Sequence, residues 1–462
     1  MPPRLTLAGS RRSAQLDPTN HVGPRHGVRM ILSLIALYVL LWGFEGALRK
    51  WVPSSANILY FTRDAIILGS LFLLSVTLPS GRRTIWKSIF WIFALFLLCM
   101  AALSVISENN TLTAALIGVR AYIAPLFLIL LVAQYAEPSA LRTIRTAMAI
   151  VVLANLPIAI IQVTSPVSAL INLQVGGSES IFVNGGTTVR ASGTFSAPAG
   201  IISLVGLGTA LSMGGIAERS ERRLQTASLI AVLALAVLSG SRGAILQASV
   251  IVGVFLLVFL LRGTLRSAAI ALGTFVAIGS MLLVTTLLFP VVVAAFQQRF
   301  VDASIVEDTP FRIFNDAVGF LNANIPILGD GPGTHQIGAV SVVGGQWIEV
   351  ETIRWTAELG IFGFALALLK ILVAIWGILF LVTRYRRVST QTLTLITLLT
   401  YTMIAGSLTQ QPTVQGGVAI LLAATWLTLL NERGASTPDM KATPARTSTA
   451  LRRQASQGRS RR

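Results

Sequence analysis

The 462 residues are 54% hydrophobic and only 12% charged, and their mean hydropathy is +0.75. Soluble domains carry about a quarter charged residues, so this composition excludes an ordinary soluble protein. The apolar residues fall in uninterrupted runs of about 17–25 residues, the length that lets a helix cross the hydrocarbon core of a bilayer. A membrane β-barrel would instead show short segments of alternating polarity. The composition therefore predicts an all-α, polytopic membrane protein.

Twelve such runs follow one another along the chain, and they predict about twelve transmembrane helices. No small-residue cleavage pattern lies near the first run, so we interpret it as a retained helix and not as a signal peptide. The predicted membrane domain covers 29–431, between basic tails at 1–28 and 432–462 whose Ser/Thr/Pro/Arg-rich sequences favour disorder. The runs are 29–47, 57–79, 85–106, 112–134, 141–164, 199–217, 224–240, 243–261, 267–289, 356–382, 390–408 and 413–430.

Lysine and arginine are distributed unevenly between the segments that connect these runs. When the segments are assigned alternately to the two sides of the membrane, 26 of the 36 basic residues fall in both tails and every second loop. Cytoplasmic segments carry such an excess, so both termini are predicted to be cytoplasmic. The segment 290–355 is then a large extracytoplasmic loop before the tenth helix. The net charge of +18 follows mainly from this topology and suits anionic lipids, and no nucleic-acid partner is expected.

A few arginines lie on the other side and depart from this bias. Arg120, in "IGVRAY" (117–122), and Arg242, in "LSGSRGAIL" (238–246), stand beside glycines near the ends of apolar runs. A charge within the bilayer is costly unless a counter-charge or a ligand offsets it. One interpretation is an outward-facing cavity for a phosphate-bearing ligand, which the planar guanidinium group suits. The alternative is structural pairing with one of the few carboxylates on that side.

Two outer segments are long enough to build a site. The segment 165–198 is rich in glycine, serine and asparagine, which predicts turns and loop around its one basic residue, Arg190. In the segment 290–355, the stretch 308–321 predicts a helix with Thr309 as N-cap, followed by proline. The apolar residues of this helix share one face, so we expect it at the membrane surface. Arg312 lies in its first turn, where it could bind an anion or simply pair with a neighbouring aspartate.

Further along this segment, "IPILGDGPGTH" (325–335) brings His335 into the same outer region. A lone histidine can be a catalyst or a hydrogen-bonded structural residue, and both interpretations stay open. Glu351, Arg354 and Glu358 have i, i+3 and i+7 spacing and would share a helix face, where pairing among themselves is the simpler interpretation.

Short motifs in a fixed order carry a resemblance to a known family. They are "GFEGALRKWVP" (43–53), "LYFTRDAIIL" (59–68), "GTFSAPAG" (193–200), "SGSRGA" (239–244), "FRIF" (311–314) with "NIPILGDGPG" (324–333), and "ETIRWTAELGIFG" (351–363). Together with the large outer loop before the tenth helix, this order resembles the O-antigen ligase/polymerase family, in its exopolysaccharide-associated branch. Proteins of this family lie in the bacterial inner membrane and act on polyprenyl-diphosphate-linked glycans.

The resemblance implies a metal-independent membrane glycosyltransferase that needs no cofactor. Its partners would be a polyprenyl-diphosphate-linked oligosaccharide, a glycan or lipid acceptor, and membrane lipids. By motif position, Arg190, Arg242 and Arg312 would hold the lipid diphosphate, and Arg120 is a fourth candidate. Ligases of this family carry a His-Asn pair nine residues before a Glu-x-Gly, and that place here holds Glu349 and Val350. This departure favours a polymerase-like or exopolysaccharide-specific member.

The base that would accept the proton of the acceptor hydroxyl has three candidates, Glu349, His335 and Glu358. Other functions compete with glycan transfer. Twelve helices with charges in the membrane also suit a secondary transporter, although the two halves of the sequence share no repeated motif. A lipid-glycan flippase would bind the same lipid. A purely structural membrane scaffold would leave the outer arginines unexplained.

Overall fold

The computed structural model describes residues 24–52, 56–77, 85–175, 183–184, 188–263, 265–291, 293–294, 297–298, 301 and 309–436. These residues form an all-helical fold with fifteen α-helices, which confirms the predicted class. Most of both predicted tails lies outside the described residues. The helices are α1 (Pro24–Trp51), α2 (Ala56–Thr77), α3 (Ile85–Ile106), α4 (Leu112–Tyr135), α5 (Ala140–Thr164), α6 (Pro198–Ala217), α7 (Arg222–Leu238), α8 (Arg242–Leu261), α9 (Leu265–Leu288), α11 (Thr309–Val318), α12 (Ile337–Val343), α13 (Glu351–Leu359), α14 (Ile361–Arg384), α15 (Thr390–Ala405) and α16 (Pro412–Ser436).

Eleven of the twelve predicted runs each coincide with one of these helices, and the tenth, 356–382, covers parts of two. In the described part of the chain, nine helices are long and apolar enough to cross a membrane: α1, α3, α4, α5, α6, α8, α9, α14 and α16. Of the other three, α7 and α15 are shorter, with 17 and 16 residues, and α2 has 22 residues. The chain is therefore a multi-pass membrane protein.

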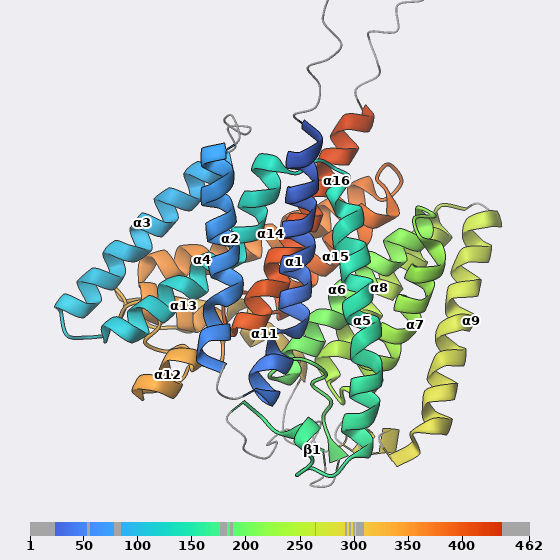
Figure 1. Ribbon diagram of the computed structural model, residues 1–462, viewed down its shortest axis with the longest axis horizontal. Helices are drawn as coiled ribbons and strands as arrows, with labels where there is room; N and C mark the ends of the chain where they lie inside the picture. The colour runs from blue at the N-terminus through green and yellow to red at the C-terminus, as the bar shows by residue number, and fades with distance from the viewer. Residues whose placement is uncertain are drawn as a thin grey trace, which may run out of the picture.

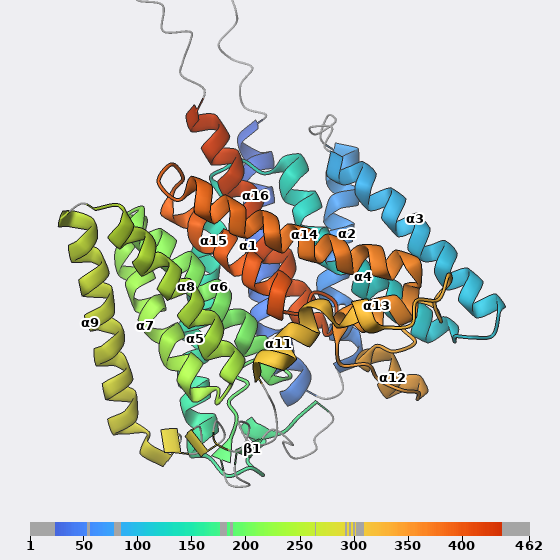
Figure 2. The ribbon, with the colours of Figure 1, turned by 180° about the vertical axis from the view of Figure 1, so that it is seen from behind.

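The helices pack so that apolar side chains both fill the interior and cover the outside. α4, α6 and α16 have most of their spans buried, whereas α3, α9 and α14 lie at the periphery and are largely exposed (Figures 1 and 2). The exposed residues of these outer helices are large and apolar, as in Trp91, Phe275 and Leu372. An outer surface of this kind suits lipid, because no polar group loses its water there.

The connecting loops gather at two ends of the bundle. α1 begins and α16 ends at the same end, at the top of Figure 1. Hydrogen bonds and ion pairs join loops that lie at the same end of the bundle. At the end that holds the termini, the Ser389 amide donates to Glu432 Oε1 at 2.7 Å, and Arg145 pairs with Glu218 at 2.9 Å. At the opposite end, Lys50 Nζ donates to Ser192 Oγ at 3.0 Å.

The long outer segments contain more structure than the sequence predicted. The Gly/Ser/Asn-rich segment forms a 3₁₀ turn (Leu170–Asn172) and a two-residue antiparallel ladder between β1 (Val183–Asn184) and β2 (Thr188–Val189). The helix predicted at 308–321 is present as α11, followed by a 3₁₀ turn at Gly319–Asn322. The short helix α12 was not predicted.

The tenth predicted span, 356–382, needs a correction because the chain breaks within it. α13 ends at Leu359 and α14 begins at Ile361, with Gly360 between them at φ +58°. That backbone conformation favours glycine, and a Cβ at this position would approach the carbonyl oxygens of Pro326 and Ile327 to 2.6 Å. The break lets α13 turn away from α14 and pack beside the outer segment.

The first two helices hold the beginning of the last one. Trp42 Nε1 on α1 donates to the Thr413 carbonyl at 2.6 Å, and Arg63 on α2 donates to the Pro412 carbonyl at 3.0 Å. Arg63 is buried and also pairs with Glu45 at 3.7 Å and Asp64 at 3.3 Å. This contact, which we call the α16 clamp (Trp42 and Arg63 on the first turn of α16), fixes the helix that lines the candidate site.

Candidate functional site

A cavity of about 710 Å³ lies at the end of the bundle opposite the termini. It opens where α6, α8 and α16 begin and where α15 ends, and α11 and α14 close its sides. Four residues singled out from the sequence line it: Arg190, Arg242, Arg312 and Glu349. These residues come from three separate parts of the chain, and the fold brings them to one place.

Arg242 is the first residue of α8 and lies at the N-terminus of that helix. α7 ends at Leu238, and a tight turn through Gly240, at φ +58°, leads into Ser241 and Arg242. Ser241, Arg242 and Gly243 all line the cavity. The start of a helix carries a partial positive charge, so this helix end and the guanidinium group both favour an anion at the same position.

Arg190 follows β2 and is held against α5 by the residues after it. The Gly193 amide donates to Gln162 Oε1 at 2.7 Å, and the Thr194 amide donates to Asn155 Oδ1 at 2.8 Å. Gly193 has φ +59°, and a Cβ there would overlap Asn155 Oδ1, so the close approach requires glycine. These buried hydrogen bonds position the backbone that carries Arg190.

Arg312 reaches the cavity from α11, which packs against α13 and α15 (Figure 2). Its Nη2 pairs with Glu349 Oε1 at 2.6 Å. Asp316 lies one helical turn further along α11 and also lines the cavity. The sequence left Asp316 as a possible partner of Arg312, but the carboxylate that pairs with it belongs to Glu349. Thr352 Oγ1 donates to the Asp316 carbonyl at 3.2 Å and ties α11 to α13.

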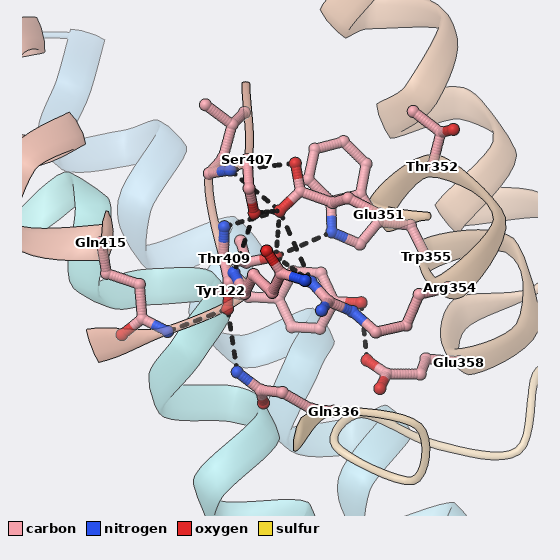
Figure 3. A network of polar contacts seen from close by, with 12 residues as sticks. Tyr122, Gln336, Glu351, Thr352, Arg354, Trp355, Glu358, Ser407, Thr409 and Gln415 are labelled. Carbon is pink, nitrogen blue, oxygen red and sulfur yellow. Dashed lines mark hydrogen bonds and ion pairs between the residues drawn. The ribbon is translucent and has the colours of Figure 1, made fainter. Parts of the chain in front are cut away.

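Glu351, at the start of α13, is the centre of a buried polar network beneath this cavity (Figure 3). Its carboxylate accepts hydrogen bonds from the backbone N–H groups of Leu408 at 2.9 Å and Thr409 at 2.7 Å. It also pairs with Lys370 at 3.2 Å and Arg354 at 3.4 Å. Lys370 in turn donates to the Gly406 carbonyl at 2.9 Å. The network thereby fixes the α15–α16 loop, which lines the cavity.

The two acidic groups beside this network have opposite pKa shifts. Burial raises the pKa of Glu351, but Lys370, Arg354 and the two backbone N–H groups outweigh it and hold that pKa below its usual range. Burial also raises the pKa of Asp316, and there Arg312 and Lys370 offset it only in part, so the pKa stays above its usual range. Glu351 is therefore a stable anion, whereas Asp316 takes up a proton more readily.

Away from these charged groups the lining is mainly apolar, with neutral polar side chains such as Ser203, Gln247 and Tyr401 among it. The apolar part is formed by side chains of α6, α8, α15 and α16, namely Ile202, Leu207, Ile245, Leu246, Leu398, Val414, Val418 and Leu421. The cavity therefore combines a cationic end with a long apolar surface within the bundle. This combination matches an amphiphile that has an anionic head and a hydrocarbon chain.

Three predicted site residues do not line the cavity. Arg120 is buried on α4 and pairs with Asp64 at 2.6 Å, which is the structural alternative considered for it. Glu358 is fully buried and accepts hydrogen bonds from Tyr122 Oη at 2.7 Å and from the His335 amide at 3.0 Å. His335 has both ring nitrogens engaged, one with the Gln346 carbonyl at 2.9 Å and one with Asp330 at 2.8 Å.

Sequence reasoning missed Lys370, considered Asp316 only as a pairing partner of Arg312, and did not foresee the role of Glu351. Spacing gave one usable signal, because Asp316 is four residues after Arg312 and so shares its helix face. Lys370 gave another, as a charge inside an apolar run. Among the described residues, no group of three or more His, Cys, Asp and Glu side chains lies close enough to hold a metal ion.

The chain matches no protein-family model, no curated protein and no solved structure. Its class therefore rests on its own features: it is a polytopic, all-helical membrane protein with an amphiphilic cavity lined by three arginines.

Proposed function

We propose that this protein transfers or polymerises a polyprenyl-diphosphate-linked glycan at the outer face of the bacterial inner membrane, as an O-antigen or exopolysaccharide polymerase or ligase does. One observation carries the proposal. Arg190, Arg242 and Arg312, which are far apart in the sequence, line one cavity that also has a long apolar surface. Arginine suits phosphate because its planar head offers several donors, and the apolar walls suit the first part of a polyprenyl chain.

In the proposed reaction, an acceptor hydroxyl oxygen attacks the anomeric carbon of the lipid-linked sugar. The bond between that carbon and the phosphate oxygen breaks, and its electron pair leaves with the lipid diphosphate. Negative charge grows on the diphosphate as the bond breaks, so preorganised arginines stabilise the transition state more than the bound substrate. A diphosphate is already a good leaving group, and these residues supply the charge stabilisation that it needs.

The proposal includes a topology. All twelve apolar helices cross the membrane, both termini are cytoplasmic, and the segment 290–355 lies outside with the cavity. The uneven distribution of basic residues supports this orientation. The gathering of α1's start and α16's end on one side of the bundle supports an even number of crossings (Figure 1). The cavity's position at the opposite end then makes it accessible from the outer leaflet.

The test begins with cells that lack the gene. A polymerase deletion accumulates single lipid-linked repeats, whereas a ligase deletion leaves full-length polymer unattached to its acceptor. In a second step, the purified full-length protein in nanodiscs is incubated with the lipid-linked glycan that these cells accumulate. Formation of longer or transferred glycan, with release of polyprenyl diphosphate, supports the proposal. Unchanged surface glycan, or movement of the lipid across vesicles without transfer, would exclude it and favour a transporter or flippase.

A further inference from the structure

Three carboxylates line the cavity among the described residues, and their surroundings differ. They are Asp316 on α11, Glu349 before α13 and Glu351 at the start of α13. A transfer reaction releases the proton of the acceptor hydroxyl, and a carboxylate can take it only if an oxygen is accessible and not already neutralised. The general base should therefore be the carboxylate whose oxygens are least engaged by hydrogen-bond donors and cations.

Glu351 is not available to accept this proton. Its oxygens accept hydrogen bonds from Ser407, Leu408 and Thr409, with donor distances of 2.7–3.0 Å, in addition to the pairs with Lys370 and Arg354. A carboxylate with this many donors is strongly stabilised as the anion, because each bond is lost or weakened on protonation. Its role is to position the α15–α16 loop.

Glu349, the base candidate from sequence spacing, is engaged with an arginine. Its Oε1 lies 2.6 Å from Arg312 Nη2, a short charge-assisted contact. Protonating Glu349 would break this pair and leave Arg312 without its anion in the cavity. The pair is better suited to aiming Arg312 at a phosphate than to taking up a proton.

The surroundings of Asp316 differ from those of both glutamates. It is half-buried, and outside the hydrogen bonds of its own helix its backbone carbonyl accepts from Thr352 Oγ1. Its carboxylate makes no hydrogen bond or ion pair with the described part of the chain, while cations on two elements act on it from a distance. It also stands one turn from Arg312, so a group next to a bound diphosphate would be within its reach.

We propose that Asp316 is the general base of the transfer reaction and accepts the proton of the acceptor hydroxyl. This inference rests on the proposed function. As the acceptor oxygen bonds to the anomeric carbon, its proton moves to an Asp316 carboxylate oxygen, and the sugar–phosphate bond breaks toward the arginines. The proton then passes to water as the product leaves, which returns Asp316 to its anionic form.

The charged and titratable groups around Asp316 predict the pH behaviour of this step. They are Arg312 on its own helix, Glu349 and Glu351 at the start of α13, Lys370 on α14 and Tyr401 on α15. Burial outweighs the two cations and raises the pKa of Asp316, so its basic form is lost at a higher pH than for an ordinary aspartate. The rate should fall on the acid side as Asp316 takes up a proton.

The experiment measures transfer by purified full-length protein in nanodiscs, with the lipid-linked glycan accumulated by cells lacking the gene. Asp316→Asn keeps the size and shape of the side chain but cannot accept the proton, and kcat should fall by about 10²–10⁴. The acid limb of its kcat–pH profile should disappear. Asp316→Glu should restore part of kcat together with that limb. Glu349→Gln is the matched control in the same cavity: it should retain the limb and change mainly the KM for the lipid-linked donor.

Binding of farnesyl diphosphate, a sugar-free probe, separates this inference from the proposed function. Wild type and Asp316→Asn should bind it equally if Asp316 acts on the acceptor side. If wild type neither binds the probe nor makes product, the proposed function itself fails. If wild type transfers glycan while Asp316→Asn keeps its kcat and acid limb, or if Glu349→Gln loses that limb, the assignment of Asp316 is wrong and the proposed function stands.

Discussion

Glu351→Gln tests whether the buried network beneath the cavity is held together by charge. The substitution keeps an oxygen that can accept from the Leu408 and Thr409 backbone, but it removes the negative charge that lies 3.2 Å from Lys370 and 3.4 Å from Arg354. Glu351, Lys370 and Arg354 are each at most 5% exposed, so water cannot replace the lost partner. Removing one member of such a buried pair costs about 3–5 kcal/mol.

A second substitution identifies the source of this cost. In the double variant Glu351→Gln/Lys370→Met, an apolar side chain of similar length replaces the stranded ammonium group. Exchanging a buried ion pair for uncharged side chains is often neutral, so the double variant should recover about 1–3 kcal/mol relative to Glu351→Gln alone. The measurement is equilibrium unfolding in mixed detergent–SDS micelles, followed by tryptophan fluorescence. A double variant that is less stable than Glu351→Gln would refute the charge argument.

The same network predicts a dependence of stability on pH. The folded-state pKa of Glu351 lies below its ordinary value of 4.5, so its contribution is complete above that value and is lost as the pH falls through the lower, folded pKa. In Lys370→Met the largest opposing charge is gone, and burial then raises the pKa of Glu351. Acidification through this range should therefore cost Lys370→Met less stability than wild type, and a folded pKa above 4.5 would turn the loss into a gain. Identical acid unfolding profiles would contradict the assigned cause.

Three further predictions concern the site, the outer segment and the topology. Arg242→Ala should reduce kcat for glycan transfer by about 10²–10³ with normal membrane insertion, and Arg242→Lys should recover only part of kcat because an ammonium lacks the planar fork of a guanidinium. If Arg242→Ala instead reduces the amount of protein in the membrane without loss of specific activity, Arg242 has a structural role. Gly118→Ala should destabilise the outer segment, because a Cβ there would overlap the backbone of Pro332 and Gly333, and protease accessibility of residues 325–336 would report it. In a Cys99→Ser background, an impermeant thiol reagent applied to whole cells should label Val340→Cys but not Ser220→Cys, and the reverse pattern would overturn the orientation and the catalytic proposal together.

The helices were predictable because a segment that crosses lipid must satisfy its backbone hydrogen bonds within itself. Twenty apolar residues in a row leave the chain no other way to satisfy its backbone, so every predicted run is helical, although the tenth is divided between α13 and α14. The break at Gly360 was not predicted, because hydropathy placed residues 356–359 in the same span as the apolar residues of α14. Its cause is the distant carbonyl oxygens of Pro326 and Ile327, which only the folded chain brings close.

The site was predictable in part. Arg190, Arg242 and Arg312 stood out because a charge among apolar residues needs an explanation, and all three line the cavity. Arg120 stood out equally but is paired with Asp64, 56 residues earlier in the chain. The position of one arginine in the sequence cannot distinguish a cavity-lining arginine from one paired with a carboxylate, because tertiary packing determines which group lies beside it. Asp316 was considered only as a partner of Arg312 for the converse reason: a polar helix face with both charges resembles an ordinary solvated surface.

The α16 clamp has a consequence for how the protein is made. Arg63 and Trp42 emerge from the ribosome roughly 350 residues before the carbonyl groups that they bind, as the sequence separations of 349 and 371 show. Until the last helix is inserted, Arg63 has Glu45, Asp64 and the Tyr38 ring beside it but not the Pro412 carbonyl, and the cavity lacks one wall. The arginine-lined cavity can therefore close only at the end of synthesis, so a partly translated chain in the membrane would not present the complete cavity. A nascent chain truncated before residue 412 provides the natural unassembled state against which to measure that dependence.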